Sequence, residues 1–205
     1  MVNMCFINSI GNNEDALDKN RETRLVEKIE NKVLNIINHY AEKENEFGVI
    51  FGVTQFKDQI AFDRIDKLKR DASKTPLHTV ILTEIAIPFS QIDCEWSRKE
   101  KAIFARQVIR ADKISRVDRM DNYIVHGCAF DIYYPEKIKM TVKYMIDNSD
   151  VVIVVHDGNI DKIKGYLEYA RIKGCEIETV SCDIEDEANG ISDYNRAILT
   201  GAYRL

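Results

Sequence analysis

Short apolar runs alternate along the chain with longer stretches in which apolar residues recur every three or four positions. Continuous apolar runs of about five residues are typical of strands that are buried on both faces of a sheet. The third run contains the charged residue Glu84 and is closed by Pro88, which cannot continue a central strand. The pattern predicts strands at residues 4–7, 47–51, 79–89, 113–117, 151–155 and 176–180.

The stretches between the predicted strands carry apolar residues at the spacing of one helix face. Leu25, Ile29 and Val33 begin the first series, after a polar stretch, residues 8–22, that we expect to be a loop. Pro135 suits the first turn of a later helix, and Gly174 suits the end of the last one. The pattern predicts helices over residues 25–40, 56–68, 98–110, 135–148 and 163–173, and leaves residues 122–134 ambiguous.

Strands that alternate with helices and read as continuous apolar runs indicate a parallel sheet covered on both faces. We therefore predict an α/β protein with a Rossmann-like, doubly wound, mainly parallel sheet and helices on both faces. The length of 205 residues suits one such domain, which we place at residues 1–182. Residues 183–205 are a C-terminal extension that opens with the acidic run 183–187, and both a docked helix and a partner-binding tail stay open for it.

The charge balance makes a polyanionic partner unfavourable. The chain has 29 Lys and Arg against 34 Asp and Glu, a net charge of −5. An acidic protein repels the phosphate backbone, so we expect no nucleic-acid partner. The longest aliphatic run, residues 151–155, is far shorter than the roughly 20 residues of a membrane span. We therefore expect no membrane association and a cytoplasmic location.

The cysteines and histidines show no metal or disulfide spacing. The five cysteines include no Cys-x-x-Cys pair, and the four histidines are isolated along the chain. An odd number of scattered cysteines favours free, buried thiols over a disulfide framework. We predict no metal and no cofactor.

Three stretches together carry a resemblance to a known family. They are residues 87–91 (Ile-Pro-Phe-Ser-Gln) followed by Trp96, residues 144–150 (Tyr-Met-Ile-Asp-Asn-Ser-Asp), and residues 169–174 (Tyr-Ala-Arg-Ile-Lys-Gly). With the order of the predicted elements, they resemble the SLOG superfamily, specifically its YpsA/YoqJ-like branch of Gram-positive bacteria and their phages, which is related to the Lonely-guy proteins. The resemblance implies a Rossmann-like fold with a nucleotide-derived ligand at the carboxyl ends of the strands.

The phosphate-binding turns of that family are altered here. Residues 8–11 read Asn-Ser-Ile-Gly in place of a Thr-Gly-His-Arg type turn, and the glycine-rich turn after the second strand keeps only Gly52. Thr141 and Val142 replace an Arg-Asn pair. Asp161 stands where a Gly-Gly-Thr motif is usual, and we expect it to be the N-cap of the following helix, where its charge repels phosphate.

These changes favour a binding protein over an enzyme. The carboxylates near predicted strand ends, Asp58, Asp93, Glu95 and Asp157, form no recognisable catalytic pair, and Tyr166 stands where related transferases carry a glutamate. We expect a non-catalytic protein that binds a nucleotide-derived small molecule, with sequestration of a defence signal as one role in a phage or mobile-element setting. A pseudoenzyme that acts through protein contacts and a nucleotide N-glycosidic hydrolase are the alternatives. We also expect a homo-oligomer, and a host protein is a further possible partner.

The candidate ligand-binding residues share a place at the carboxyl ends of the predicted strands, and most are polar. Trp96 offers a stacking platform, and packing against a helix is the competing interpretation. The predicted set is Asn8, Ser9, Gly52, Gln55, Asp58, Gln59, Ser90, Gln91, Trp96, Asp157, Gly158 and Asn159.

Overall fold

The structure is a computed structural model. It describes residues 1–8, 19–52, 56–71, 73–126, 130–156 and 160–181, and it describes the side chains in these ranges except at 19–22, 56–60 and 130–133.

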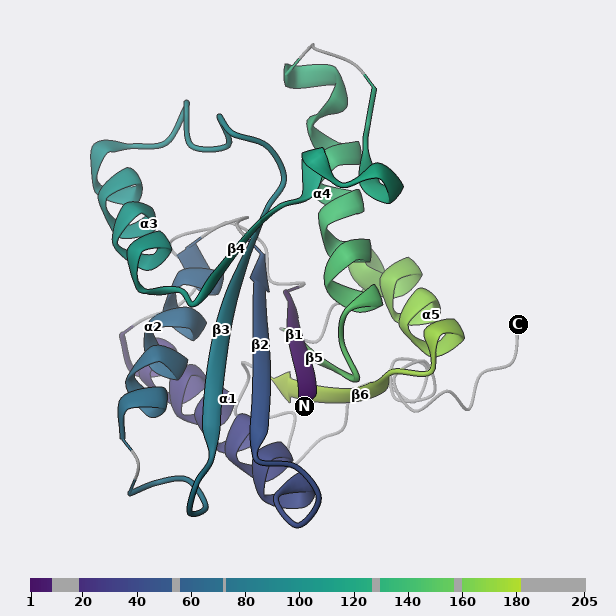
Figure 1. The fold of residues 1–205 in the computed structure, drawn as a ribbon. Coiled ribbons are helices and arrows are strands. Elements are labelled where there is room, and N and C mark those ends of the chain that lie inside the picture. Colours follow the sequence, from purple (N-terminus) through teal and green to yellow (C-terminus); the bar gives the residue numbers. More distant parts are fainter. Residues whose placement is uncertain (9–18, 53–55, 72, 127–129, 157–159, 182–205) are drawn as a thin grey trace.

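A parallel sheet forms the centre of the described chain. Its strands lie in the order β4-β3-β2-β1-β5-β6, and every neighbouring pair is parallel. The chain therefore builds outward from β1 to β4 and then starts again beside β1 with β5 (Figure 1). The strands are β1 (Val2–Asn8), β2 (Glu46–Gly52), β3 (Val80–Ile87), β4 (Lys113–Arg116), β5 (Val151–His156) and β6 (Glu176–Ser181). The predicted α/β fold with a doubly wound sheet is confirmed.

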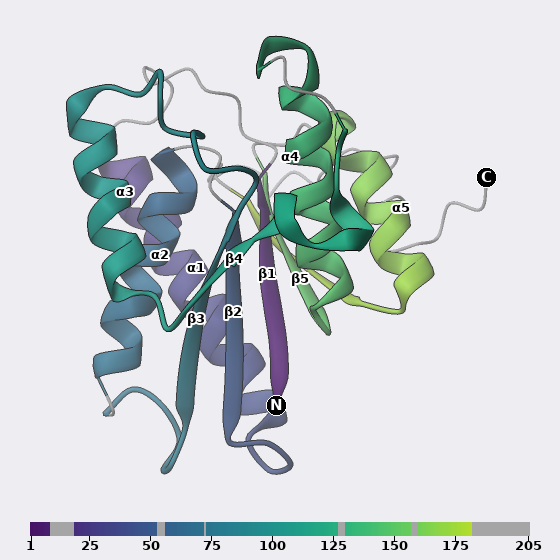
Figure 2. The same cartoon turned by 45° about the horizontal axis from the view of Figure 1, so that its top comes forward.

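Helices cover both faces of this sheet (Figures 1 and 2). One face carries α1 (Lys19–Tyr40), α2 (Phe56–Arg70) and α3 (Arg98–Arg110), and the other carries α4 (Phe130–Asp147) and α5 (Lys164–Lys173). Short 3-10 turns, η2 (Val117–Arg119), η3 (Asp121–Tyr123) and η4 (Asp161–Ile163), join some of these elements. No helix in the described ranges is both long and apolar enough to cross a membrane.

The central strands β1, β2 and β5 send alternate side chains to two separate cores. From β1, Met4 and Phe6 enter the core under α1, α2 and α3, whereas Cys5 and Ile7 enter the core under α4 and α5. Phe6 stacks on the neighbouring Phe51 at 5.3 Å between ring centroids. Strands buried on both faces require apolar residues at consecutive positions, which is why the strands were visible as continuous runs.

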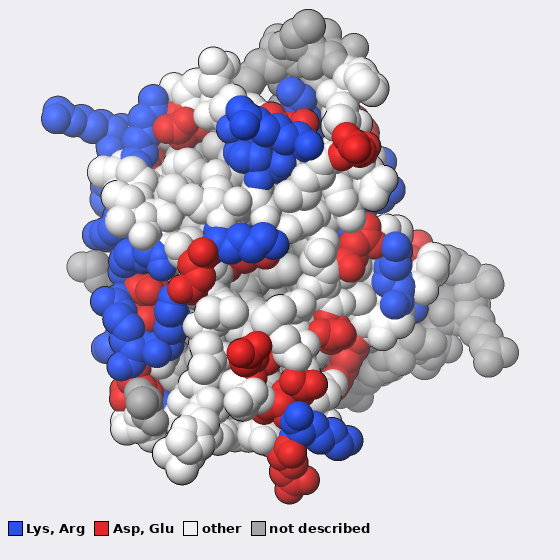
Figure 3. All heavy atoms as spheres, viewed as in Figure 1, with Lys and Arg blue, Asp and Glu red and all other residues white. Residues whose placement is uncertain are grey.

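Ion pairs hold the three helices of the first layer together. The buried carboxylate of Asp66 on α2 contacts Arg110 of α3 at 3.0 Å. Glu30 of α1, also buried, contacts Lys74 at 2.9 Å and pairs with Arg64 of α2. Figure 3 shows basic and acidic side chains side by side along the edge where α2 and α3 lie. Many of the basic groups on this side are therefore neutralised within the protein.

Three sequence-based boundaries are corrected by the structure. Residues 19–22, expected in a loop, are the first turn of α1, so the helix starts before the apolar positions from which it was predicted. The last residue of the predicted fourth strand, Val117, begins η2 instead. The helix expected to start at Pro135 begins at Phe130, so that Pro135 lies inside α4. Packing stabilises α4 on both sides of the proline, since the Tyr134 ring meets Phe89 at 5.9 Å and the Lys137 ammonium lies 5.0 Å from the same ring.

The predicted N-cap at Asp161 is also wrong. A 3-10 turn precedes α5, and its N-cap is Ile160, whereas the N-cap of α5 itself is Ile163. Neither residue has a side-chain capping bond. Asp161 is the first residue of that turn, so its negative charge still lies where the prediction placed it. The predicted stop at Gly174 is confirmed by its left-handed backbone, with φ of 80°.

The two later stretches of the family resemblance contact each other through Asp147. Its carboxylate, at the end of α4, accepts hydrogen bonds from the hydroxyls of Tyr123 and Tyr169, each at 2.8 Å, and from the Lys173 ammonium at 2.6 Å. Partial burial opposes ionisation, but the bonds from Lys173, Tyr123 and Tyr169 outweigh it and lower the pKa of Asp147. These motif residues therefore lock α4 onto α5 and η3.

Tyr144, from the same stretch, ties α4 to the sheet. Its buried hydroxyl donates to the Glu84 carboxylate at 2.6 Å and lies 3.1 Å from Ser115 Oγ. Lys113, the register partner of Glu84 on β4, contacts the same carboxylate at 2.9 Å. The charged residue inside the third apolar run is therefore fully partnered.

Candidate ligand-binding site

The loop between β3 and α3 is a series of tight turns at the carboxyl edge of the sheet (Figure 2). Phe89 and Ile92 of this loop are 7% and 2% exposed and pack in the core. Gln91, Cys94 and Glu95 of the same loop are exposed. Three backbone bonds fix the turns, from the N–H of Ile92 to Phe89 O, of Cys94 to Gln91 O, and of Trp96 to Asp93 O.

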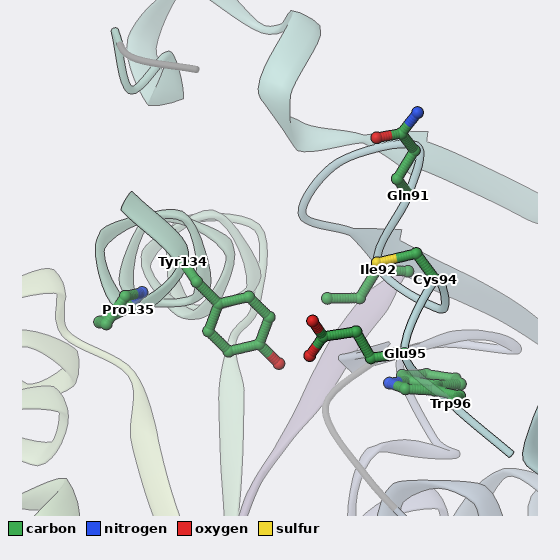
Figure 4. Close-up of a pocket in the computed structure, with 7 residues that line it drawn as sticks. All are labelled: Gln91, Ile92, Cys94, Glu95, Trp96, Tyr134 and Pro135. Atoms are coloured by element: carbon green, nitrogen blue, oxygen red, sulfur yellow. The ribbon is translucent and has the colours of Figure 1, made fainter. Parts of the chain in front are cut away.

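A cavity of about 710 Å³ lies between this loop and the first turns of α4. Tyr134, on α4, faces the loop, and its hydroxyl points toward the carboxylate of Glu95 (Figure 4). Trp96 lies beside Glu95, and Gln91 lies at the far end of the loop (Figure 4). The lining residues are Gln91, Ile92, Cys94, Glu95, Trp96, Tyr134 and Pro135.

Glu95 is the charged group of this cavity. Within the described part of the chain, no basic group and no hydrogen-bond donor contacts its carboxylate, in contrast to the paired Glu30, Glu84 and Asp147. Burial and the nearby charge of Glu95 raise the pKa of Tyr134, so the phenol stays protonated and can donate. The cavity therefore offers a carboxylate acceptor and a hydroxyl donor that points toward it (Figure 4).

The structure confirms the helix-packing interpretation of Trp96, and the stacking of a ligand on its ring stays a prediction. Its ring packs edge-on against Phe104 of α3, with 5.4 Å between centroids, and it is only partly buried. The same side chain lines the cavity. One part of the indole therefore anchors α3 while another part is available to a ligand.

Two lysines bring positive charge to the flanks of the cavity. The Lys101 ammonium donates to the carbonyl oxygen of Cys94 at 3.0 Å, and the Lys137 ammonium lies over the Phe89 ring. Cys94 lines the cavity, and Phe89 contacts Tyr134, which lines the opposite wall. Neither lysine lines the cavity itself, but each contacts a residue of the cavity or of its wall.

The amino end of α3 is occupied by its own residues. Ser97 Oγ accepts the N–H of Glu100 at 3.3 Å, and Glu100 accepts the N–H of Ser97 at 2.7 Å. This reciprocal capping box uses amide groups that an anion would otherwise bind and adds a negative charge. A phosphate is therefore not expected at this helix end.

The structure brings Gln91 and Trp96 of the predicted set together in the cavity. Ser90 is exposed in the same loop but does not line it. Asn8 and Gly52 end β1 and β2 at the same edge of the parallel sheet, and neither lines the cavity.

The remaining predicted site residues lie where the structure gives no side chains. Asp58 and Gln59 belong to the first turn of α2, and their side chains are outside the description. The others, Ser9, Gln55, Asp157, Gly158 and Asn159, lie outside the described residues.

Sequence reasoning missed five lining residues: Ile92, Cys94, Glu95, Tyr134 and Pro135. The sequence marked Glu95 only as a carboxylate without a catalytic partner, and Tyr134 lies in the stretch 122–134 whose structure the sequence left ambiguous. The Ser97–Glu100 spacing, which is typical of a capping box, would have marked the end of the loop and drawn attention to the residues before it. Tyr134 carried no such local signal, because its position depends on the packing of α4.

The cysteines differ from the uniform burial that was expected. Cys5 is buried, and burial raises its pKa to about 12. Cys94 is exposed at the cavity, and Cys175 is partly buried. Cys128 and Cys182 lie outside the described residues. All three described cysteines are free thiols.

The positions compared with related enzymes lie elsewhere. Thr141 is buried and donates its hydroxyl to the carbonyl of Lys137 at 2.9 Å. Tyr166 lines a separate hollow of about 400 Å³ between α4 and α5, together with Lys139, Lys143 and Lys162. Neither residue takes part in the cavity beside Trp96.

Comparison with known proteins supplies a relative of the chain. No protein-family model matches it. YoqJ of Bacillus subtilis (strain 168), described as an uncharacterized SPbeta prophage-derived protein, is 32% identical over 144 residues, which cover 70% of this chain and 81% of YoqJ. The chain belongs to the YoqJ family. The predicted similarity to YoqJ-like proteins is thereby confirmed, and the parallel sheet of this family member is compatible with a Rossmann-like fold.

Proposed function

We propose that this YoqJ-family protein is a non-catalytic SLOG-type protein that binds a nucleotide-derived small molecule between the β3–α3 loop and α4. The observation that carries the proposal is the cavity of about 710 Å³ in which Trp96 and Tyr134 flank the carboxylate of Glu95. The position agrees with the general rule that open α/β sheets bind ligands outside the carboxyl ends of their strands.

The chemistry of the lining suits a flat, polar ring. Indole and phenol rings contact planar heterocycles through their faces, and each buries a large area at little cost in conformational entropy. Glu95 and Gln91 add hydrogen-bonding groups that fix the orientation of the ring. Cavities for small molecules commonly have volumes of about 300 to 1,000 Å³, and this one lies within that range.

The charges around the cavity suit a nucleotide bound without a phosphate nest. Lys101 and Lys137 provide point charges, while the capping box of α3 occupies a helix end that would otherwise hold phosphate. We expect such a site to bind through its base and sugar, with phosphate as a weaker contribution.

The lining favours binding over hydrolysis. Hydrolysis of an N-glycosidic bond needs a group that activates water or acts as nucleophile and a second group that assists departure of the base. Glu95 is the one carboxylate among the described lining residues. The prophage origin of YoqJ supports a phage setting, in which sequestration of a nucleotide-derived defence signal is the role we propose.

A thermal-shift screen with nucleotides, cyclic nucleotides and ADP-ribose derivatives tests this function. A ligand present at about 100 times its dissociation constant adds about 2.7 kcal/mol, which raises the Tm by about 5 to 11 °C for a protein of this size. Glu95→Gln is expected to reduce the shift, because the substitution removes the charge from the cavity. Glu42→Gln, at an exposed carboxylate outside the cavity, is the matched control and is expected to behave like the wild type.

Two results would contradict the proposal. A flat screen together with a tight oligomer or a co-purifying protein would favour a role in protein contacts. Release of free base from a nucleotide during incubation would favour the hydrolase.

A further inference from the structure

The free carboxylate of Glu95 sets a requirement on whatever ring lies beside it. An ionised carboxylate accepts hydrogen bonds through both oxygens and donates none. Glu95 is exposed, and no basic group of the described chain reaches it, so a ligand that displaces water from its carboxylate has to supply donors of its own. A ligand edge that presents only acceptors would place its own lone pairs against those of the carboxylate, which is unfavourable.

The position of Glu95 directs it at the edge of a stacked ring. It precedes Trp96 in the loop, and Tyr134 approaches it from the opposite wall (Figure 4). A heterocycle that stacks on Trp96 presents its edge, rather than its face, to the neighbouring carboxylate. The aromatic surroundings therefore place a base, and not a sugar, next to Glu95.

Bases differ in the donors along that edge. A guanine-type ring has a ring N–H directly beside an exocyclic amine, so two parallel N–H groups meet two carboxylate oxygens. Adenine has an unprotonated ring nitrogen beside its amine, and hypoxanthine has the ring N–H without the amine. Only the guanine-type edge satisfies both oxygens of Glu95 at once.

We infer that the cavity selects ligands that carry a guanine-type base, with Glu95 accepting from the ring N–H and the exocyclic amine. This inference rests on the proposed function and specifies the ligand class of the same site. The hydroxyl of Tyr134 points toward the same carboxylate from the opposite wall of the cavity (Figure 4). Lys101 and Lys137, which contact Cys94 and Phe89, are the basic groups that we assign to the 5′-phosphate of such a nucleotide.

Isothermal titration calorimetry with GMP, IMP, AMP and 2′-deoxy-GMP tests the inference on the full chain. GMP is expected to bind about 5- to 150-fold more tightly than IMP or AMP, since a good bidentate pair is worth about 1 to 3 kcal/mol of discrimination. The deoxynucleotide is expected to match GMP. In Glu95→Gln the preference for GMP over IMP is expected to fall to less than about threefold. The glutamine amide has one oxygen that accepts and one NH2 group that donates, so its NH2 group would face an N–H of the guanine edge. Glu42→Gln is expected to keep the wild-type preference.

The outcomes separate this inference from the function on which it rests. Equal binding of GMP, IMP and AMP overturns the base assignment and leaves nucleotide binding in place. Weaker binding of the deoxynucleotide than of GMP overturns it as well, because Glu95 would then accept from the ribose hydroxyls. If none of the nucleotides gives a heat of binding and none raises the Tm in the thermal-shift screen, the proposed function itself is overturned.

Discussion

Replacing Asp147 by alanine is expected to lower the free energy of unfolding by about 2 to 3 kcal/mol. The substitution removes the acceptor of two tyrosine hydroxyl bonds, and bonds from a neutral donor to a partly solvated charge are worth about 1 to 1.5 kcal/mol each. The bridge to Lys173 adds little, because the lysine side chain is 43% exposed. The contact joins α4 to α5 and η3, so the loss is expected to appear in global unfolding.

Urea unfolding of single and double variants tests the size and origin of this effect. Tyr123→Phe and Tyr169→Phe each remove one bond and are expected to cost about 1 to 1.5 kcal/mol alone, but almost nothing in the Asp147→Ala background. Asp121→Ala, at an exposed carboxylate of η3, is the control and is expected to change stability by less than about 0.5 kcal/mol.

The coupling is also expected to depend on pH. The pKa of Asp147 is lower in the folded protein than in the unfolded chain, so its stabilising effect is complete above about pH 5 and is lost as the pH falls through the folded value. Coupling of each tyrosine to Asp147 is expected to be largest near neutral pH and to shrink in acid. Two results would refute this reasoning. One is that Asp147→Ala is as stable as Asp121→Ala, and the other is that the coupling energy between Asp147 and either tyrosine grows in acid.

Three further changes test local features of the structure. Gly174→Ala is expected to cost about 1 kcal/mol in chemical denaturation because φ is positive there, whereas Gly165→Ala, with open space around the new methyl group and a helical backbone, is expected to stabilise by about 0.5 to 1 kcal/mol. Tyr144→Phe is expected to cost about 1.5 to 3 kcal/mol because a buried hydroxyl bond to a carboxylate is lost, while Tyr166→Phe stays close to wild type. The exposed Cys94 thiol is expected to react with a thiol reagent in the folded protein, and mass spectrometry is expected to show slower labelling when a stabilising nucleotide is present.

Local patterns were sufficient to predict most of the fold. The apolar runs identified β1, β2, β3 and β5, and α3 has the predicted bounds, residues 98–110. The start of α4 was wrong, because a proline inside a helix is tolerated only when neighbouring contacts stabilise the helix, and the contacts of Phe89 with Tyr134 and Lys137 join segments far apart in sequence. The sequence also could not predict the hydrogen bond between Glu84 and Tyr144, because the two residues lie 60 positions apart.

The site was predicted only as far as it lies on one loop. Gln91 and Trp96 follow the carboxyl end of a predicted strand, so a rule about parallel sheets was enough to select them. Tyr134 forms the opposite wall, and its place depends on how α4 packs on the sheet. The sequence could not distinguish Glu95 from other acidic loop residues. The structure does so, because it places Glu95 in the cavity and shows that Glu84 and Asp147 are bound by other side chains.

The emission of Trp96 tests the central claim most directly, because it is the one tryptophan of the chain and lies in the cavity. A nucleotide-derived ligand that stabilises the protein is expected to change this emission, with a midpoint equal to the dissociation constant from calorimetry. In the Glu95→Gln variant, the midpoint of the emission change and the dissociation constant from calorimetry are expected to rise together. A ligand that stabilises the protein while the Trp96 emission stays constant through saturation would contradict the account, because the binding site would then lie away from the β3–α3 loop.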